Sequence, residues 1–358
     1  MTILVVGKFD KESLGSNISD GLQALGHTTI LFTKGITYWH FEIPILNRVN
    51  MIKLTLYELG QKIPGVKKIE FIKLKNLLFK NKKKIDLSIV THDFLTPNEV
   101  DYLKQTTKSP VVMWFPDAIV NFGKAMFLCS NYDALFFKDP YIVHTLRREI
   151  KKQIHYLPEC CNPVVHKVYP YNETERKKYS CNITTIGNLY SNRLELFKQL
   201  HNYNFSIKIW GNPPALWMKY DSKMKEIFKS SYLLGKDKSL AFQLGKIVLN
   251  NLHPAEIWGI NCRAFEIPAC GGFQMISWRP AISDLFIEGK EIETYKSFNE
   301  LIEKIKYYLD NDIKRQEIAK NGYNRVVNEH TYDLRLKEMI DIIFNKGKSE
   351  YNYNYSKV

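Results

Sequence analysis

The sequence predicts an α/β protein with two doubly wound domains that face each other across a cleft. Three observations lead to this prediction. The chain has 358 residues, which exceeds the usual size of one domain. Its apolar runs are short and rich in Val, Ile and Phe, as in parallel sheets that are buried on both faces. These runs alternate with helical stretches in two sets, and the second set begins near Ile183.

The first set predicts a Rossmann-like unit. After its first strand, Leu14-Gly15-Ser16-Asn17 precedes an amphipathic helix that ends at Leu25-Gly26, a glycine cap. Gly7 is followed by Lys8-Phe9-Asp10 rather than by Gly-x-Gly-x-x-Gly, which disfavours a nicotinamide dinucleotide site and dehydrogenase chemistry. The strands of this set are predicted at residues 3–7, 29–32, 87–91, 111–115 and 134–137.

A change in composition marks the boundary between the domains. A strand around His155-Tyr156 gives way to Cys160-Cys161-Asn162-Pro163 and then to a polar stretch at 169–179. We therefore expect one domain at residues 1–159 and the other at 160–332. The second domain is predicted to have strands near 183–188, 206–211, 246–252 and 273–277, and helices at 298–309 and 313–327. A last helix is predicted at 334–344.

Charge and cysteine usage limit the possible partners and compartment. The net charge of +14 favours anionic partners, but the basic residues are scattered and no RNP-like strand motif occurs, so nucleic acid is not expected. No apolar run approaches the roughly 20 residues that span a bilayer, and the N-terminus lacks the layout of a signal peptide. The six cysteines show no Cys-x-x-Cys spacing, which favours reduced thiols. A cytoplasmic protein is expected.

The densest positive charge lies at residues 67–84 and is interleaved with apolar residues, which predicts a basic amphipathic helix. One interpretation is a surface helix whose apolar face packs on its own domain and whose lysines are solvated. The other is a surface that contacts an anionic membrane or acceptor at the inner membrane face. The lysines are Lys67, Lys68, Lys73, Lys75, Lys80, Lys82, Lys83 and Lys84.

The most informative segment is residues 261–276. Its apolar residues predict a short buried helix, a turn at Gly271 and Gly272, and a buried strand at 273–277. Glu266 then faces a crevice at the edge of a sheet, where one carboxylate can accept both hydroxyls of a ribose. The two glycine amides can face a pyrophosphate. The alternative is an ordinary helix end that is capped by glycine.

The pattern Asn261-x-Arg263-x-Phe265-Glu266-x-x-Ala269-Cys270-Gly271-Gly272 resembles the donor-site signature of GT-B glycosyltransferases, in particular the CgeB-like spore-maturation group. The resemblance is close over residues 246–331 and loose in the first domain. It implies a GT-B fold, in which residues 1–159 form the acceptor side and residues 160–332 bind a nucleotide-sugar donor. It also implies that residues 333–358 pack back on the first domain, and that Asn261 and Gly15 belong to the donor site.

The segment after the strand at 183–188 is the second candidate for phosphate binding. GT-B enzymes present a glycine turn and a cationic side chain here, which implies that Gly187, Asn188 and Arg193 contact the donor diphosphate. The alternative for Arg193 is a surface salt bridge in the first turn of a helix. Arg263 lies three residues before Glu266 and could pair with that carboxylate or reach a phosphate.

Catalytic candidates follow two strands of the first domain. Ligands bind outside the carboxyl ends of the strands in such sheets, which brings His92, Asp93 and Asp117 towards the cleft. An inverting transferase needs such a base, and Asp117 is the preferred candidate. His92 could instead bond to backbone, and either Asp could cap a helix. The retaining Glu-x7-Glu pattern is out of register, because the nearest carboxylate before Glu266 is Glu256, so the stereochemistry stays open.

No metal or other cofactor is expected. Asp310-Asn311-Asp312 has the spacing of a metal-nucleotide motif, but it lies between two predicted helices and suits a solvated turn. The predicted reaction is glycosyl transfer from a nucleotide-diphosphate sugar to a hydroxyl of a glycan, lipid-linked or cell-surface acceptor. Two alternatives remain, a nucleotide-sugar 2-epimerase and a catalytically silent sugar-nucleotide or glycan-binding protein of the same fold.

Overall fold

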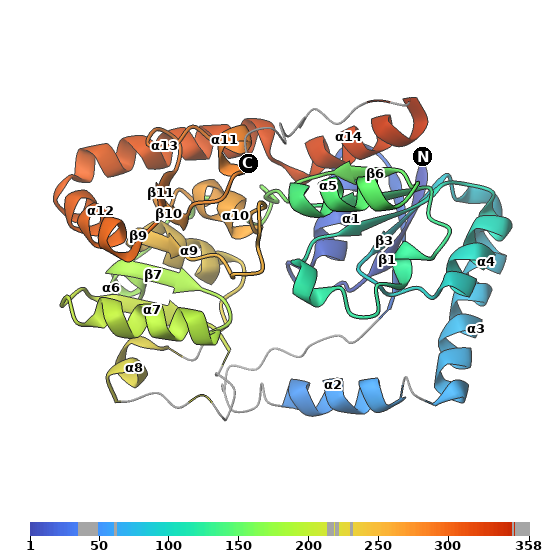
Figure 1. Cartoon of the computed structure of the whole chain (residues 1–358), viewed down its shortest axis with the longest axis horizontal. Helices are drawn as coiled ribbons and strands as arrows, with labels where there is room; N and C mark the ends of the chain where they lie inside the picture. Colours follow the sequence, from blue (N-terminus) through green and yellow to red (C-terminus); the bar gives the residue numbers. More distant parts are fainter. Residues whose placement is uncertain are drawn as a thin grey trace.

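A computed structural model contains two parallel sheets, each covered by helices on both faces, which lie side by side along the long axis of the molecule (Figure 1). The structure describes residues 1–34, 49–60, 63–212, 218, 222–229, 232–345 and 347. The predicted α/β class and the pair of Rossmann-like domains are confirmed.

The first sheet has the strand order β2-β1-β3-β4-β5-β6, and all its described pairings are parallel. Its central strands β3 and β4 are buried at every residue, because helices cover both faces. The strands are β1 Thr2–Gly7, β2 Thr28–Thr33, β3 Leu87–Thr91, β4 Val111–Phe115, β5 Ala134–Phe137 and β6 Ile154–Tyr156. The helices are α1 Leu14–Ala24, α2 Val49–Gly60, α3 Pro64–Asn81, α4 Pro97–Thr107 and α5 Pro140–Glu149.

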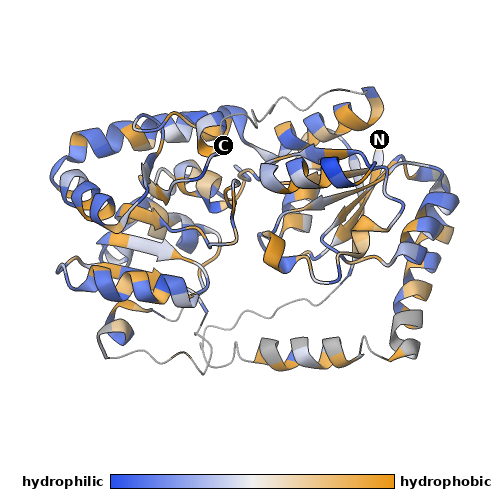
Figure 2. Ribbon diagram, in the orientation of Figure 1, coloured by the Kyte–Doolittle hydropathy of each residue, from blue (hydrophilic) through white to orange (hydrophobic). Residues whose placement is uncertain are grey.

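The second sheet has the order β11-β10-β9-β7-β8. Figure 2 shows that hydrophobic residues concentrate in the strands, while the outer helices carry hydrophilic ones. The strands are β7 Cys181–Ile186, β8 Ile207–Trp210, β9 Gly245–Asn250, β10 Gln274–Ser277 and β11 Glu293–Tyr295. The helices are α6 Glu173–Tyr179, α7 Ser191–His201, α8 Ser222–Ile227, α9 Lys236–Leu244, α10 Arg263–Ala269, α11 Ile282–Leu285, α12 Phe298–Asp310 and α13 Asp312–Glu329.

The last helix, α14 (Tyr332–Asn345), returns to the first domain. Leu336 and Met339 on α14 are buried in one cluster with Ile18 and Leu22 of α1. The two helices approach closely at Gly21, where an added Cβ would lie 2.8 Å from Leu336 Cδ1. The predicted return of the C-terminal helix is therefore confirmed as far as Asn345. The predicted boundary at 159/160 falls between β6 and β7, and the remainder of 333–358 lies largely outside the described residues.

Several elements were not predicted individually from the sequence, among them α4, α5, α6 and α9. Helix α2 was missed, and so was β11, whose three residues Glu293–Tyr295 give too short a signal. The expected helix at 67–84 exists as α3, which begins at Pro64 and is followed by a short 3-10 turn, Lys82–Lys84. Among the described residues, no helix has the length and apolar character needed to cross a bilayer.

Candidate active site

Two guanidinium groups meet beside Gly187, directly after the carboxyl end of β7. Gly187 has a φ of +130°, and a Cβ there would collide with Arg263 Nη1 and lie 3.1 Å from Arg193 Nη1. Only glycine fits this position, because both the backbone conformation and the space exclude a side chain. The turn thus brings the backbone of Gly187 close to the guanidinium groups of Arg193 and Arg263.

These arginines bond to amides and carbonyls. Arg193 donates from Nε to Asn251 Oδ1 at 2.9 Å and from Nη1 to the carbonyl of Asn188 at 2.9 Å. Arg263 donates from Nη1 to the carbonyl of Ile186 at 3.0 Å. Neither forms an ion pair with a described carboxylate, so the expected alternatives, a surface salt bridge for Arg193 and a pair with Glu266 for Arg263, are not found.

The charge of this pair is uncompensated within the described chain. Burial and the neighbouring Arg263 guanidinium lower the pKa of Arg193. Arg193 is only 2% exposed, so water compensates little of its charge. An anion held between the two guanidiniums would relieve this repulsion and could accept bidentate hydrogen bonds.

Glu266 lies on α10 and is buried. Its Oε2 lies 2.8 Å from Lys238 Nζ, and its Oε1 lies 3.5 Å from His166 Nε2. Burial would raise the pKa of Glu266, but the charges of Lys238 and His166 outweigh that effect and lower it. The carboxylate is therefore held ionised, in the state that accepts hydrogen bonds from hydroxyl groups.

The remaining predicted donor residues support this centre. Asn261 exchanges hydrogen bonds with Asn250, whose Oδ1 also lies 3.4 Å from Arg263 Nε. The amides of Gly271 and Gly272 donate to the carbonyls of Pro268 and Ile267, as in a glycine helix cap. The structure thus directs both amides to α10 rather than to a pyrophosphate.

Gly15 and Asn188 serve the turns in which they lie. Gly15 packs at the start of α1 against the carbonyl of Lys8, where a Cβ would not fit. Asn188 accepts the Arg193 hydrogen bond through its backbone carbonyl, an acceptor that every residue type supplies. The side chain of Asn188 is not needed for this contact.

The three catalytic candidates separate into a pair and a structural residue. His92 Nε2 lies 3.4 Å from Asp117 Oδ2, and the His92 side chain is 31% exposed. His92 has a φ of +59°, a strained conformation of the kind that occurs at functional sites. Asp93 instead accepts hydrogen bonds from the backbone amides of Met126 and Phe127, at 3.0 and 3.1 Å.

The sequence favoured Asp117 as the base, but the geometry of this pair suits His92 as the base and Asp117 as the residue that orients it. Burial would raise the pKa of Asp117, but the hydrogen bond and charge of His92 outweigh it and lower the pKa. A carboxylate with a lowered pKa is a weak base, and it is well suited to orient an imidazole. His92 Nδ1 has no hydrogen-bond partner among the described residues.

Ionic contacts between the domains were not predicted from the sequence. Lys138, which follows β5, lies 2.8 Å from Glu256 Oε1 of the second domain and 3.5 Å from Glu159. The next residue, Asp139, accepts a hydrogen bond from the backbone amide of Ile257 at 3.0 Å. No sequence signal pairs residues 118 positions apart, because such contacts depend on how the two domains dock.

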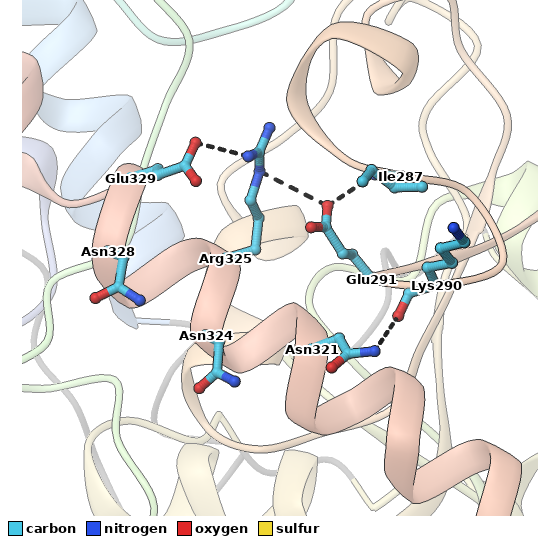
Figure 3. A pocket seen from close by; sticks show the side chains of 8 residues that line it. All are labelled: Ile287, Lys290, Glu291, Asn321, Asn324, Arg325, Asn328 and Glu329. Carbon is cyan, nitrogen blue, oxygen red and sulfur yellow. Dashed lines mark hydrogen bonds and ion pairs between the residues drawn. The ribbon is translucent and has the colours of Figure 1, made fainter.

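One pocket of about 330 Å³ lies away from these residues, between α13 and the turn at 287–291 (Figure 3). Arg325 points into it but is already paired, with Glu329 Oε2 at 2.7 Å and Glu291 Oε2 at 3.6 Å. Asn321 donates to the carbonyl of Lys290. None of the expected donor or catalytic residues lines this pocket.

Comparisons with known proteins agree with this geometry. Residues 193–341 match the sequence profile of the family described as glycosyl transferase-like, a span that includes Arg193, Arg263 and Glu266. Over this span the second domain is similar to glycosyltransferases. The chain is also 23% identical over 265 residues to the spore protein CgeB of Bacillus subtilis (strain 168), covering 68% of this chain and 76% of that protein. The CgeB-like resemblance is thereby confirmed.

Solved structures confirm the GT-B fold. Sucrose-phosphate synthase from Thermosynechococcus elongatus superimposes with a TM-score of 0.65 at 12% identity, covering 97% of this chain and all of that chain. HepE from Anabaena in complex with UDP gives a TM-score of 0.59 at 11% identity and covers 95% of this chain and all of that one. Both domains and the returning helix are thus parts of one known architecture.

Proposed function

We propose that the protein transfers a sugar from a nucleoside-diphosphate sugar to a hydroxyl acceptor. The observation that carries this proposal is the meeting of Arg193 and Arg263 beside Gly187 with no described carboxylate to neutralise them. A diphosphate supplies the missing negative charge and matches the planar guanidinium fork. Glu266, three residues from Arg263 on α10, accepts the hydroxyls of the ribose.

The proton transfer is assigned to the first domain. The acceptor hydroxyl approaches His92, which removes its proton while Asp117 orients the imidazole and stabilises the cation that forms. The leaving diphosphate develops negative charge at the two arginines, which stabilise it without a metal ion. This assignment places donor and acceptor chemistry on opposite sides of the cleft.

Nucleotide binding tests the donor part directly. Thermal shift with UDP, GDP, ADP and CDP selects the nucleotide, and calorimetry then compares wild type with Arg263→Met. We expect an affinity loss of roughly 10- to 100-fold, the usual effect of losing a charge-assisted hydrogen bond. Arg176→Met is the control, because this exposed arginine of α6 pairs with Glu173 at 3.9 Å and lies on a different helix from both candidate arginines. Equal losses in both variants would contradict the site.

Turnover separates the proposal from its two alternatives. A silent binding protein would bind the nucleotide but release no sugar, whereas an active transferase hydrolyses its donor slowly even without acceptor. A 2-epimerase would return an isomerised donor, which chromatography detects. The spare carboxylate that an epimerase would need, Glu256, is held by Lys138, which favours transfer.

For the acceptor side, we further propose that α3 docks on an anionic membrane surface. Leu74 and Leu78 of α3 are buried, and Phe71 contacts Tyr102 of α4. A second apolar stripe consists of Ile69, Ile72 and Phe79, which share one face of α3 because they are spaced by three and seven positions. These three side chains are exposed, so this face is not the one that packs on α4. Phe79 is 79% exposed, so the packing of α3 on the first domain buries only one of its two apolar faces.

Charge complementarity supports a lipid surface as the occupant of this stripe. Lys73, Lys80, Lys82 and Lys84 are exposed beside it, and α2 adds Ile52, Leu56 and Leu59, each more than half exposed. The side chains of Lys67, Lys68 and Lys83 lie outside the described residues. Lysines near anionic lipid contribute about 1 kcal/mol each, and apolar side chains add insertion.

Vesicle flotation tests this docking. Wild type should float with vesicles that contain phosphatidylglycerol and less with pure phosphatidylcholine, and salt should weaken the binding. Lys80→Glu/Lys82→Glu/Lys84→Glu should lose it, and Phe79→Ser should weaken it. Lys177→Glu/Lys178→Glu/Lys320→Glu makes the same change in net charge at exposed positions elsewhere. Equal flotation of both triple variants would refute a specific surface.

A further inference from the structure

Glu12 belongs to the first domain, but its carboxylate is bound by the second domain and the connection between them. It follows β1, in the loop before α1, and its side chain is 3% exposed. Its Oε2 accepts from Lys238 Nζ at 2.9 Å and lies 3.5 Å from His166 Nε2. Its Oε1 accepts from the backbone amide of Gly235, just before α9.

The groups around this carboxylate form an anion-binding pocket. His166 Nδ1 accepts a hydrogen bond from the amide of Asn162 at 3.1 Å, so Nε2 carries the ring hydrogen and lies 3.5 Å from the carboxylate. Together with an ammonium and a backbone N–H, this gives three donors that converge on one negatively charged group. The pocket is thus built from residues that follow the first domain and is filled by a residue of that domain.

The same two side chains, Lys238 and His166, hold Glu266. Lys238 Nζ lies 2.8 Å from Glu266 Oε2 and 2.9 Å from Glu12 Oε2, and His166 Nε2 is 3.5 Å from both carboxylates. The Glu266 side chain is only 7% exposed with these contacts in place. A ligand can therefore reach this carboxylate only after the cluster opens.

The backbone conformation of Glu12 indicates which residue leaves the cluster when it opens. Glu12 has a φ of +62°, in the left-handed region that non-glycine residues seldom occupy. Such conformations persist where surrounding contacts hold them, and they release strain when those contacts break. Glu266 and Lys238 lie on helices of one domain, whereas Glu12 lies on a loop of the other.

We propose that Glu12 is an internal plug of the donor site, which holds the pocket of Lys238, His166 and Gly235 until a nucleotide displaces it. This inference rests on the proposed function, because it takes Glu266 as the ribose ligand. Donor binding then exchanges one anion for another: the Glu12 carboxylate leaves the pocket, and the nucleoside diphosphate enters the opened site. The contact between the domains therefore opens as the donor enters.

Removal of the plug should tighten nucleotide binding. Glu12→Gln removes the charge and keeps the size of the side chain, while Lys238 keeps Glu266 as its partner. Because wild type must first break a charge-assisted contact, we expect UDP, or the nucleotide selected by thermal shift, to bind about 10-fold more tightly to the variant. Glu12→Gly should do the same and also relieve the strained backbone, so it guards against poor folding of the first variant.

A control is available within the second domain. Glu175→Gln removes a carboxylate of α6 that pairs with Lys236 Nζ at 2.7 Å, and Lys236 lies on α9 two residues before Lys238. Its nucleotide affinity should equal that of wild type. Unchanged or weaker binding by both Glu12 variants would overturn the proposal, since a bridge that only holds the domains together would not compete with the donor.

Hydrogen exchange tests the plug without relying on nucleotide chemistry. In the free protein, Glu12→Gln should raise exchange at the amide of Gly235 and in residues 8–13, whereas Glu175→Gln should not. Equal protection in wild type and variant would overturn the plug even if no nucleotide binds. Adding nucleotide to wild type should also raise exchange in residues 8–13, a signature opposite to the protection that ordinary ligand contact gives. If Glu12→Gln raises exchange in residues 8–13 but no nucleotide binds, the proposed function is wrong, whereas the contact made by Glu12 is confirmed.

Discussion

The two sides of the cleft differ in how fully their functional groups are fixed. In the second domain, Arg193 is 2% exposed and Glu266 6%, and both are held by several partners. In the first domain, the side chains of His92 and Asp117 are 31% and 43% exposed and hold mainly each other. The donor half is therefore built in advance, while the acceptor half faces solvent.

This difference fits the demands of the two ligands. A diphosphate is highly charged, and once Glu12 has left the neighbouring pocket the fixed guanidinium groups of Arg193 and Arg263 can bind it with little rearrangement of their own. An acceptor hydroxyl needs only a base within reach, and the rest of the acceptor binds through surfaces that vary with the substrate. Mutations should accordingly affect turnover on one side of the cleft and nucleotide affinity on the other.

The largest effect is expected from the first domain. His92→Ala and Asp117→Asn should each lower kcat by about 100-fold or more, because the acceptor proton loses its base or the base loses its orientation. Nucleotide affinity should stay nearly constant in both. Steady-state kinetics and calorimetry on the same preparations measure the two quantities.

Asp93→Asn tests whether this aspartate, next to His92 in the same loop, acts as a base or only binds the backbone. Asp93 caps the backbone at Met126 and Phe127, so this change should lower the melting temperature and leave kcat within a few-fold of wild type. Loss of turnover in Asp93→Asn at full stability, with His92→Ala still active, would move the base to Asp93. Activity in all three variants would remove general-base catalysis from the mechanism.

The next effect is expected in the second domain. Glu266→Ala should weaken nucleotide binding by roughly 1.5 to 3 kcal/mol, the usual contribution of hydrogen bonds to a charged group. The change leaves Lys238 paired with Glu12, so the fold should persist. Calorimetry measures the loss, and circular dichroism checks the fold. Wild-type affinity in a folded variant would show that Glu266 serves only the ionic cluster.

The sequence constrained the candidates of the second domain more closely than those of the first, for physical reasons. Gly187, Arg193, Arg263 and Glu266 lie beside turns and short helices, where local spacing constrains the geometry. The strands were predictable for a related reason, since β4 and β5 are continuous apolar runs. Where prediction used only a strand end, as for Asp93, it could not tell a backbone cap from a base.

The contacts between the domains could not be predicted from the sequence. Glu12 and Lys238 are separated by 226 positions, and neither stands in a recognisable motif. Their meeting depends on the docking of two sheets, which no local pattern encodes. The second apolar stripe of α3 was visible as seven apolar residues among lysines, but only packing on α4 shows which stripe is buried.

A smaller effect follows from the pH dependence of the Glu12 contact. Burial would raise the pKa of Glu12, but His166 and Lys238 outweigh it and lower the pKa from an ordinary value near 4.5 to about 2. A lowered pKa in the folded state gives stability that is present above about pH 4.5 and is lost as the pH falls towards 2. Since Lys238 retains Glu266, we expect a contribution of about 1 to 2 kcal/mol.

Urea unfolding at several pH values measures this contribution. The difference in unfolding free energy between wild type and Glu12→Gln should be constant from pH 7 to 5 and shrink below pH 4.5. Glu175→Gln serves again as control. A difference that grows as the pH falls would mean that the Glu12 carboxylate is destabilised by its surroundings, contrary to the contacts described.

The smallest effect is expected from removal of metal ions. Arg193 and Arg263 already supply two positive charges where the leaving diphosphate develops its own, the role that a divalent ion otherwise takes. Asp310-Asn311-Asp312, the one metal-like motif considered, lies at the junction of α12 and α13, where Asp312 pairs with Arg315 and Asn311 bonds to the carbonyl of Tyr307. Turnover should therefore be unchanged in EDTA, within the error of the assay. If chelation abolishes turnover and Mg²⁺ or Mn²⁺ restores it, the arginines do not suffice for the leaving group. In that case Arg263→Met should lower turnover far less than it lowers nucleotide affinity, and the two halves of the cleft would have to share an ion between them.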